Sequence, residues 1–325
     1  MREESTFLDR FASCLSRIDE ELGKALNSKV SLIEEVGRHS LLGGGKRLRP
    51  LFFILSCQLC NYHKSDMYPL SATFEYLHAA SLLHDDVLDN ASIRRGRSSA
   101  NRVWGNPAAI LVGDFLFSRS SSMAVEKKHI EFLKVLADTA TRMTEGQMLE
   151  LINTHNWKIT RGEYMGIITS KTAALISAAC ASGAIVARAE QAHIKSLRDF
   201  GLNMGIAFQI VDDLFDYTST EEKTGKPTGN DLREGKITLP LIYTLSYLDK
   251  GERDRLEDLF KNGNASEKDY LRIIELVKDN GAINKCHKDA QDYVNLAETY
   301  LNPFPDSPIK ESLLKLNQFI VDRSH

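Results

Sequence analysis

Residues 78–97, HAASLLHDDVLDNASIRRGR, decide the fold and the chemistry of this chain, because they set three carboxylates beside three arginines. On a helix, His78, Asp85 and Asp89 return to nearly the same face, with Asp86 about 100° around it. Two carboxylates one turn apart repel each other, so a cation is expected between them. Mg²⁺ suits this arrangement, because it combines one or two carboxylates with water and phosphate oxygens. A solvated acidic helix end is the alternative for one such motif alone.

A second copy of the DDxxD motif lies in GIAFQIVDDLFD, where Gln209, Asp212 and Asp216 share one face of another helix, beside Asp213. Both motifs follow apolar sequence, so both helices should be largely buried with the acids at one end. Two accidental copies in one chain are improbable. We expect the two helices to face each other across a cavity, where Mg²⁺ ions bridge the carboxylates to a diphosphate.

The composition describes a soluble globular protein with a large core, since 42% of the 325 residues are hydrophobic and 26% are charged. A net charge of -3 argues against a general nucleic-acid binder. The first residues lack the apolar segment of a signal peptide, and no uninterrupted transmembrane-length apolar run occurs, which predicts a cytoplasmic protein. The five cysteines are expected to be reduced, and the CxxC of Cys57 and Cys60 lacks the second ligand pair of a zinc site.

Apolar residues recur every three or four positions over most of the chain, without an alternating strand of convincing length. The chain has no repeat, low-complexity tract or flexible linker, which predicts one domain over residues 1–325. The predicted fold class is all-α, a single large helical bundle around a central active-site cavity. Helices are expected over residues 5–26, 30–41, 50–61, 68–91, 107–125, 128–154, 160–186, 191–218, 237–249, 266–279, 282–302 and 309–322.

Two clusters of cations suit a ligand that contains phosphate. Glycines at 43–45 precede Lys46 and Arg49 in a turn that lacks the spacing of a nucleotide-binding P-loop. Arg94 and Arg95 follow the first acidic motif, and adjacent guanidinium groups point in different directions, so they suit two different diphosphates. A solvated charged turn is the alternative for each cluster.

Three lysines further along the chain favour the same chemistry. Lys171 lies in the small, apolar stretch SKTAA, where an unpaired ammonium would be costly, so we expect it to face an anion. Lys226 and Lys236 lie on the glycine-rich segment TGKPTGNDLREGKITLP after the second acidic motif. We expect this segment to be a mobile loop that closes over bound phosphate and excludes water.

In this order, the motifs resemble those of the trans-prenyltransferases, the all-helical polyprenyl diphosphate synthases. The matching segments are GGGKRLRP, HDDVLDNASIRRG, GDFLF, SKTAAL, FQIVDDLFD and GKPTGNDLREGKITLP. The resemblance implies an isoprenoid synthase fold that joins isopentenyl diphosphate head to tail with an allylic diphosphate. It places Lys46, Arg49, His78 and Arg95 on isopentenyl diphosphate, Arg94, Lys171, Thr172, Gln209, Lys226 and Lys236 on the allylic diphosphate, and Asp85, Asp86, Asp89, Asp212, Asp213 and Asp216 on two or three Mg²⁺ ions.

The implied reaction follows from charge. Breaking the allylic C–O bond leaves negative charge on diphosphate, so metal ions and cations that hold this leaving group lower the barrier. Thr172 and Gln209 are expected beside the carbocation and Lys171 on the leaving group, while the resemblance assigns the final proton to the released diphosphate. The family commonly has Gly-Glu-x-x-Gln where this chain has GQMLE at residues 146–150, so no family role carries over to positions 147 and 150.

The residues before the first acidic motif predict a long product. If the diphosphate is held at Asp85, the hydrocarbon runs toward the helix N-terminus, where Ala80 and Ser81 are too small to stop it. The resemblance places an aromatic residue at this level in short-chain enzymes. The resemblance to long-chain prokaryotic enzymes implies roughly seven to nine isoprene units, with eight favoured, and we expect Met123 and Leu136 at the floor of the tunnel. The implied enzyme is an octaprenyl diphosphate synthase for quinone side chains, a homodimer that extends farnesyl diphosphate and releases its product by peripheral membrane contact.

Two alternatives stay open on sequence alone. A class I terpene cyclase shares the helical fold and the first DDxxD, but such enzymes usually replace the second motif and lack an isopentenyl diphosphate site. A non-catalytic subunit of a heteromeric prenyl synthase tends to lose its acidic residues, whereas this chain keeps both sets.

Overall fold

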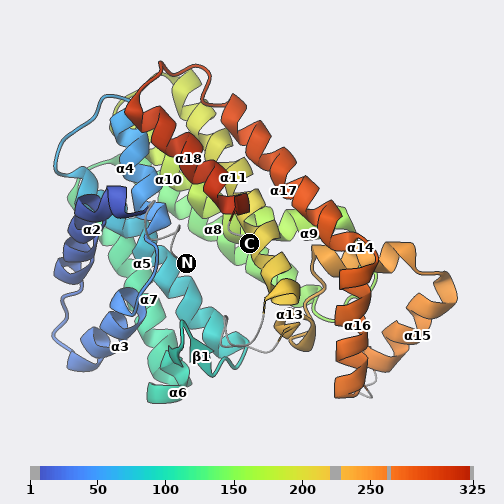
Figure 1. The fold of residues 1–325 in the computed structure, drawn as a ribbon. Coiled ribbons are helices and arrows are strands. Elements are labelled where there is room, and N and C mark those ends of the chain that lie inside the picture. Colours follow the sequence, from blue (N-terminus) through green and yellow to red (C-terminus); the bar gives the residue numbers. More distant parts are fainter. Residues whose placement is uncertain (1–7, 220–227, 262–264, 323–325) are drawn as a thin grey trace. The chain divides into compact units, whose positions relative to one another are not determined.

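The structure is a computed structural model that describes residues 8–219, 228–261 and 265–322. Most of these residues are helical, as predicted (Figure 1). The main helices are α2 (Ala12–Ala25), α3 (Ser31–Leu42), α4 (Leu48–Leu59), α5 (Met67–Leu88), α7 (Asn106–Glu126), α8 (Ile130–Ile152), α9 (Arg161–Ile168), α10 (Ala174–Val186), α11 (Gln191–Thr218), α14 (Leu239–Tyr247), α15 (Lys250–Lys261), α16 (Glu267–Asp279), α17 (Ala282–Thr299) and α18 (Pro308–Asp322). The shorter elements are the helical turns η1 (Asp9–Phe11), α6 (Ala100–Trp104), η2 (Thr169–Ala173) and α13 (Asn230–Arg233), and the strands β1 (Ile93–Arg94) and β2 (Arg97–Ser98).

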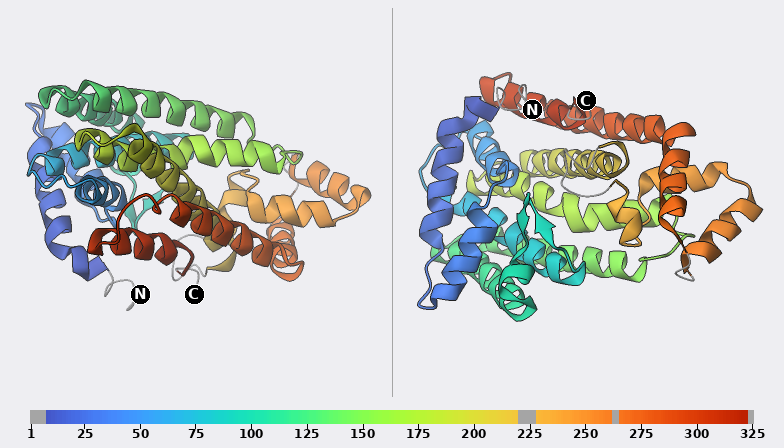
Figure 2. Two further views of the ribbon diagram at one scale, coloured as in Figure 1. Left: turned by 90° about the horizontal axis from the view of Figure 1, so that it is seen from above. Right: turned by 60° about the horizontal axis from the view of Figure 1, so that its bottom comes forward.

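Apart from the short helical turns α6 and α13, which the prediction also lacks, the main differences from the predicted helices lie in three places. Residues 160–186, predicted as one helix, form α9 and α10 with the π-helical turn η2 between them. The segment after α5 forms an antiparallel ribbon in which Ile93 pairs with Ser98, drawn as two short arrows in Figure 2. Helix α15 is absent from the predicted set, because its sequence, KGERDRLEDLFK, is mostly charged and its apolar stripe is narrow.

The chain forms two compact units, which we describe separately. The first comprises Met1–Thr141, Leu175–Gly201 and Tyr300–Leu314, and the second comprises Arg142–Ala174, Leu202–Thr299 and Lys315–His325. The first acidic motif belongs to the first unit and the second motif to the second unit. Both the single domain over residues 1–325 and the meeting of the two motifs across one cavity therefore stay predictions.

Helix α5 organises the core of the first unit, where it packs against α2, α4 and α7. Three fully buried rings, Phe53, Phe74 and Phe132, contact one another on its inner side, with centroids 5.6 to 5.9 Å apart. Such edge and tilted contacts add to the free energy gained by burying the rings. The helix is therefore fixed at its apolar end, and this fixes the direction in which its acidic end points.

Two helical stretches, Asn106–Glu126 and Arg161–Val186, are long and apolar enough to cross a membrane by length and composition alone. Buried helices of a folded core pass the same test. In the second stretch 67% of the most apolar window is buried, and α7, the first stretch, packs along α5. The second stretch is accounted for as a core helix, whereas only 39% of the most apolar window of α7 is buried.

Cys57 and Cys60 carry unreactive thiols. Burial raises the pKa of the Cys57 thiol and raises that of Cys60 to about 11.

Candidate active site

The first acidic motif lies at the C-terminal end of α5, as predicted. His78, Ser81, Asp85 and Asp89 are partly exposed, although nearly all of the preceding helix is buried. The predicted stripe from His78 to Asp89 is thus an accessible one. Asp86 lies on the buried face of the helix, with only 3% of its surface exposed.

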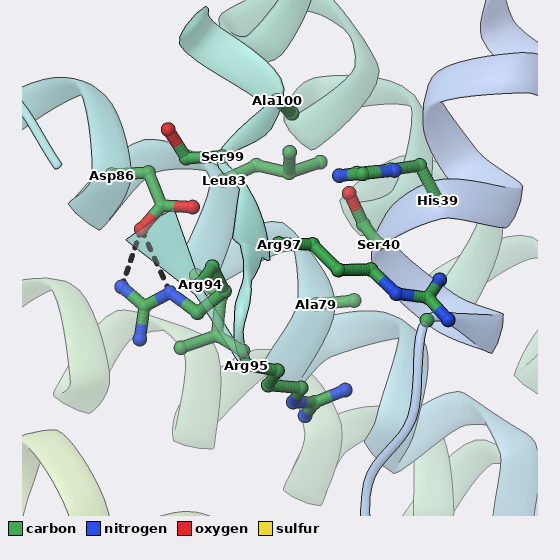
Figure 3. A pocket seen from close by; sticks show the side chains of 12 residues that line it. His39, Ser40, Ala79, Leu83, Asp86, Arg94, Arg95, Arg97, Ser99 and Ala100 are labelled. Atoms are coloured by element: carbon green, nitrogen blue, oxygen red, sulfur yellow. Dashed lines mark hydrogen bonds and ion pairs between the residues drawn. The ribbon is translucent and has the colours of Figure 1, made fainter. Parts of the chain in front are cut away.

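Asp86 is held by the β-ribbon. Its Oδ1 accepts hydrogen bonds from Arg94 Nε, at 2.8 Å, and from Arg94 Nη2. The same side of α5 lines a pocket, along which Arg97 also extends, past Ser40 (Figure 3). Arg94 and Asp86, predicted on the allylic diphosphate and on the metal, are each other's partners here, and both roles stay predictions.

The glycine-rich turn and the β-ribbon bring together most of the group predicted for isopentenyl diphosphate. The Arg95 guanidinium donates to the carbonyl oxygen of Gly44, in the turn that carries Lys46. Burial of the ring, then the charges of Arg49 and Arg95, lower the pKa of His78 well below its usual range. A neutral imidazole among guanidinium groups can hydrogen-bond a phosphate oxygen without adding to their mutual repulsion.

Arg47 anchors this turn and was not among the predicted site residues. It adopts a left-handed backbone conformation, with φ 52°, and its side chain is buried. Arg47 Nε donates to Asp19 Oδ1 at 2.7 Å, and Nη1 donates to the buried Glu75 Oε1 at 3.0 Å. Glu75 could have indicated that a buried cation was needed, because a lone acid in the apolar stretch MYPLSATFEYL requires a cationic partner.

The second acidic motif lies at the C-terminal end of α11, with Asp213 buried at its centre. Tyr164 Oη donates to Asp213 Oδ2 at 2.6 Å, and Gln209 Nε2 donates to Oδ1 at 2.7 Å. Gln209 Oε1 in turn accepts from Thr172 Oγ1 at 2.8 Å. Burial raises the pKa of Asp213 to about 7, although both hydrogen bonds oppose the shift. The structure thus joins Thr172 to Gln209, whose predicted place beside the carbocation stays a prediction, and supplies Tyr164, which sequence reasoning missed.

Asp216 is oriented by backbone amides of the segment that follows. Its Oδ1 accepts from the N–H of Asn230 and its Oδ2 from the N–H of Asp231, each at 3.0 Å. Asp231 was also missed, and it is close enough that, after burial, the charges of Asp216 and Asp213 raise its pKa well above its usual range. Asp212, the first acid of the motif, is exposed.

The glycine-rich segment after α11 is described from Thr228 onward, and the mobility expected of it stays a prediction. From Thr228 onward it folds against the second motif and contains α13. Lys236 Nζ donates to Glu234 Oε2 at 2.7 Å, and its backbone N–H donates to the carbonyl oxygen of Asp231. Lys226, predicted to bind the allylic diphosphate, lies outside the described residues.

Lys171 lies on η2, which packs closely against two glycines, Gly146 of α8 and Gly205 of α11. A Cβ atom added to Gly146 would lie 2.5 Å from the backbone nitrogen of Lys171, and one added to Gly205 would lie 2.7 Å from Ala173 Cα. The helices can approach this closely only because those side chains are missing. The Lys171 ammonium donates to Glu150 Oε2, so the lysine does face an anion, one of the protein's own carboxylates.

Replacing Gly146 by alanine is therefore expected to destabilise the protein by about 1–3 kcal/mol, the usual cost of overpacking. A Cβ on Gly166 of α9 meets nothing within 4 Å, so Gly166→Ala is the matched control and is expected to stabilise slightly, because alanine favours the helix. Urea unfolding of the two variants measures the difference. Equal stability of the two would show that the α8 backbone does not touch η2.

The residues present fit divalent metal ions that are shared with a phosphate ligand. Within the described part of the chain, no three His, Cys, Asp or Glu side chains converge to hold a metal ion by themselves. Each motif instead offers two acids one turn apart, Asp85 with Asp89 and Asp212 with Asp216. Mg²⁺ prefers this kind of site, since it keeps positions for water and phosphate oxygens.

Comparisons with known proteins agree with this site. The polyprenyl synthetase family model matches residues 30–277. The chain is 34% identical to an octaprenyl diphosphate synthase of Haemophilus influenzae, over 96% of this chain and 94% of the relative. Among solved structures it is similar to a decaprenyl diphosphate synthase from Rhodobacter capsulatus, with 34% identity, a TM-score of 0.92 and 99% of each chain covered.

A second similar structure is a polyprenyl synthase from Caulobacter crescentus CB15, solved in complex with calcium and isoprenyl diphosphate, with 36% identity, a TM-score of 0.94 and 98% of each chain covered. These matches confirm the predicted all-α, isoprenoid synthase fold. They also agree with the motifs in both units described above. The chain therefore belongs to the polyprenyl synthetase family and is a prenyltransferase, a polyprenyl diphosphate synthase.

Proposed function

We propose that the protein extends an allylic diphosphate with isopentenyl diphosphate to a long trans product of roughly eight isoprene units, the length in the name of the octaprenyl diphosphate synthase relative. The observation that carries this proposal is that both acidic motifs are complete and the cationic cluster around His78 accompanies the first. A terpene cyclase has no use for a second diphosphate site. The long-chain character is supported by Ala80 and Ser81 below Asp85, and by similarity to octaprenyl and decaprenyl enzymes.

The charges of the candidate site residues give them different roles. Asp85, Asp89, Asp212 and Asp216 would hold Mg²⁺, which when bound supplies positive charge to the departing diphosphate. Lys171 adds a further cation to that leaving group. Thr172, the next residue, and Gln209, to which it is hydrogen-bonded, present oxygens that would stabilise developing positive charge.

The group around His78 orients isopentenyl diphosphate for attack. Arg49 and Arg95 bind its phosphates, and the neutral His78 adds a hydrogen bond without further charge. Lys46, in the same turn, completes the cluster. No described side chain is required as the base, because the released diphosphate takes the proton.

Incubation of the protein with Mg²⁺, farnesyl diphosphate and labelled isopentenyl diphosphate tests this function. Products near eight units are expected after dephosphorylation and chromatography. A cyclic hydrocarbon formed without isopentenyl diphosphate would indicate a cyclase, and no product at all would indicate a non-catalytic subunit.

The two diphosphate sites are expected to respond to different substitutions. Arg95→Ala should raise KM for isopentenyl diphosphate about tenfold or more, and Lys171→Ala should do so for the allylic substrate, because each loses a contact to a different anion. Arg102→Ala removes an exposed arginine of α6 outside the pocket that Arg95 lines; it is the control and should change neither KM by more than about twofold. Initial rates with each substrate varied in turn measure the effects. Equal changes in both KM values for both variants would contradict the division.

We further propose that the protein is a homodimer in the cytoplasm and that its product enters quinone synthesis at a membrane. The dimer is supported by an apolar face on α7, where Ile110, Leu111, Phe117 and Val125 are 41–65% exposed. A second copy of this chain would cover that face. Light scattering at working concentration tests this, and a monomer mass would exclude it.

A further inference from the structure

The carboxylate of Glu150 on α8 contacts Lys171, the cation assigned above to the allylic diphosphate. Glu150 Oε2 accepts a hydrogen bond from Lys171 Nζ. The two side chains are 19% and 23% exposed, so water and salt screen the pair less than they would at the surface. A carboxylate of the protein thus occupies the lysine that the substrate diphosphate is proposed to bind.

The backbones on both sides of this pair are fixed. Gly146 lies one helical turn before Glu150 on α8 and holds that helix against η2, while Gly205 holds η2 from the other side. Neither glycine position leaves room for the turn to shift. Only the side chains can rearrange, and the four-carbon stem of Lys171 allows its ammonium to leave Glu150 without backbone movement.

Within GQMLE, residues 146–150, it is the carboxylate of Glu150 that binds the Lys171 ammonium, not the amide of Gln147. Gln147 Oε1 is buried and has no hydrogen-bond partner among the described residues. Glu150 therefore places a negative charge directly on the lysine that the diphosphate must bind.

We propose that Glu150 competes with diphosphate for Lys171 and so limits how tightly the allylic site retains the leaving pyrophosphate. This inference rests on the proposed role of Lys171. When diphosphate binds, the ammonium turns to it, and when pyrophosphate departs, Glu150 takes the ammonium back. An enzyme that repeats its condensation must release pyrophosphate in every cycle, so weaker retention favours repeated extension.

Glu150→Gln tests the competition, because glutamine keeps the shape and the hydrogen-bond acceptor but removes the charge. In isothermal titration with inorganic pyrophosphate and MgCl₂, the Kd is expected to fall about tenfold. KM for the allylic diphosphate should fall as well, KM for isopentenyl diphosphate should not change, and kcat should fall because release slows. Glu145→Gln, the same change at an exposed position of α8, is the matched control and should leave the Kd unchanged.

A double-mutant cycle decides whether the effect passes through Lys171. In a Lys171→Met background, Glu150→Gln should improve pyrophosphate binding by no more than about twofold. An undiminished gain there would show general repulsion instead of competition, and would overturn the proposal. Weaker or unchanged pyrophosphate binding in the Glu150→Gln single variant would overturn it too, since Glu150 would then merely position the lysine.

Thermal unfolding of each variant checks that it is folded. If Glu150→Gln does not fold, Glu150→Asp, which withdraws the carboxylate by one methylene, carries the same test with a smaller tightening. The pyrophosphate titration needs no turnover, so it gives its answer separately from the product assay. A wild-type protein that forms no prenyl product would contradict the proposed function. An unchanged Kd for pyrophosphate in the Glu150→Gln variant would contradict only the role of Glu150.

Discussion

Replacing Asp85 or Asp212 by alanine is expected to lower kcat by about three powers of ten or more, because each loss removes charge that holds the metal on the leaving group. The fold should survive, since Asp85 is only partly buried and Asp212 is exposed, so neither truncation opens a core cavity. Initial rates across a Mg²⁺ titration measure the loss, and thermal unfolding checks the fold.

Asp138→Ala is the control for this pair of variants. Asp138 is an exposed acid on α8 that forms a surface ion pair with Lys134, one helical turn away, and such pairs contribute little. Near-native turnover is expected for it at every Mg²⁺ concentration. If Asp85→Ala or Asp212→Ala behaved in the same way at limiting Mg²⁺, that aspartate would not belong to a metal site.

The structure separates acids that look equivalent in the sequence. In each DDxxD motif the second aspartate is buried and bonded to protein, Asp86 to Arg94 and Asp213 to Tyr164 and Gln209. The first and last aspartates of each motif are accessible or partly accessible. Helical periodicity predicts that the second acid lies about 100° from the first, but it cannot tell what lies in that direction.

The helices and the acidic ends of α5 and α11 could be predicted, because apolar periodicity is a local property of the sequence. The π-helical turn η2 could not, since its cause lies in other helices, where Gly146 and Gly205 permit close approach. The Lys171–Glu150 pair follows from that approach. Sequence reasoning expected an anion for Lys171 but could not tell that the protein supplies one.

The segment after the second motif shows the same limit. Its glycines predict a loop, and Gly229 and Gly235 do adopt positive φ angles, 74° and 79°. Between them, however, the chain bonds to Asp216, an acid at the end of a different helix. Turn residues indicate where a chain bends, but the partner of the bend depends on tertiary structure.

Replacing Ser81 by phenylalanine is expected to shorten the product from roughly eight isoprene units to about three or four, because the ring would close the path one helical turn, or about 5.4 Å, below Asp85. Ser81 is partly exposed on the same stripe as His78 and Asp85, and its Oγ donates only to the His78 carbonyl oxygen, at 2.8 Å. The position is therefore less closely packed than that of the adjacent Ala80. Chromatography of the dephosphorylated products measures the change.

Ala80 offers a comparison on the adjacent residue. It is only 2% exposed, so Ala80→Phe has to displace packed neighbours and is expected to cost about 1–3 kcal/mol of stability as well as shortening the product. Ser81→Phe should shorten the product without that cost, and the first condensation should continue in both variants. Met123 and Leu136, both buried, stay the predicted floor for the longer wild-type chain. Full-length product from both phenylalanine variants would mean that the hydrocarbon does not run along α5.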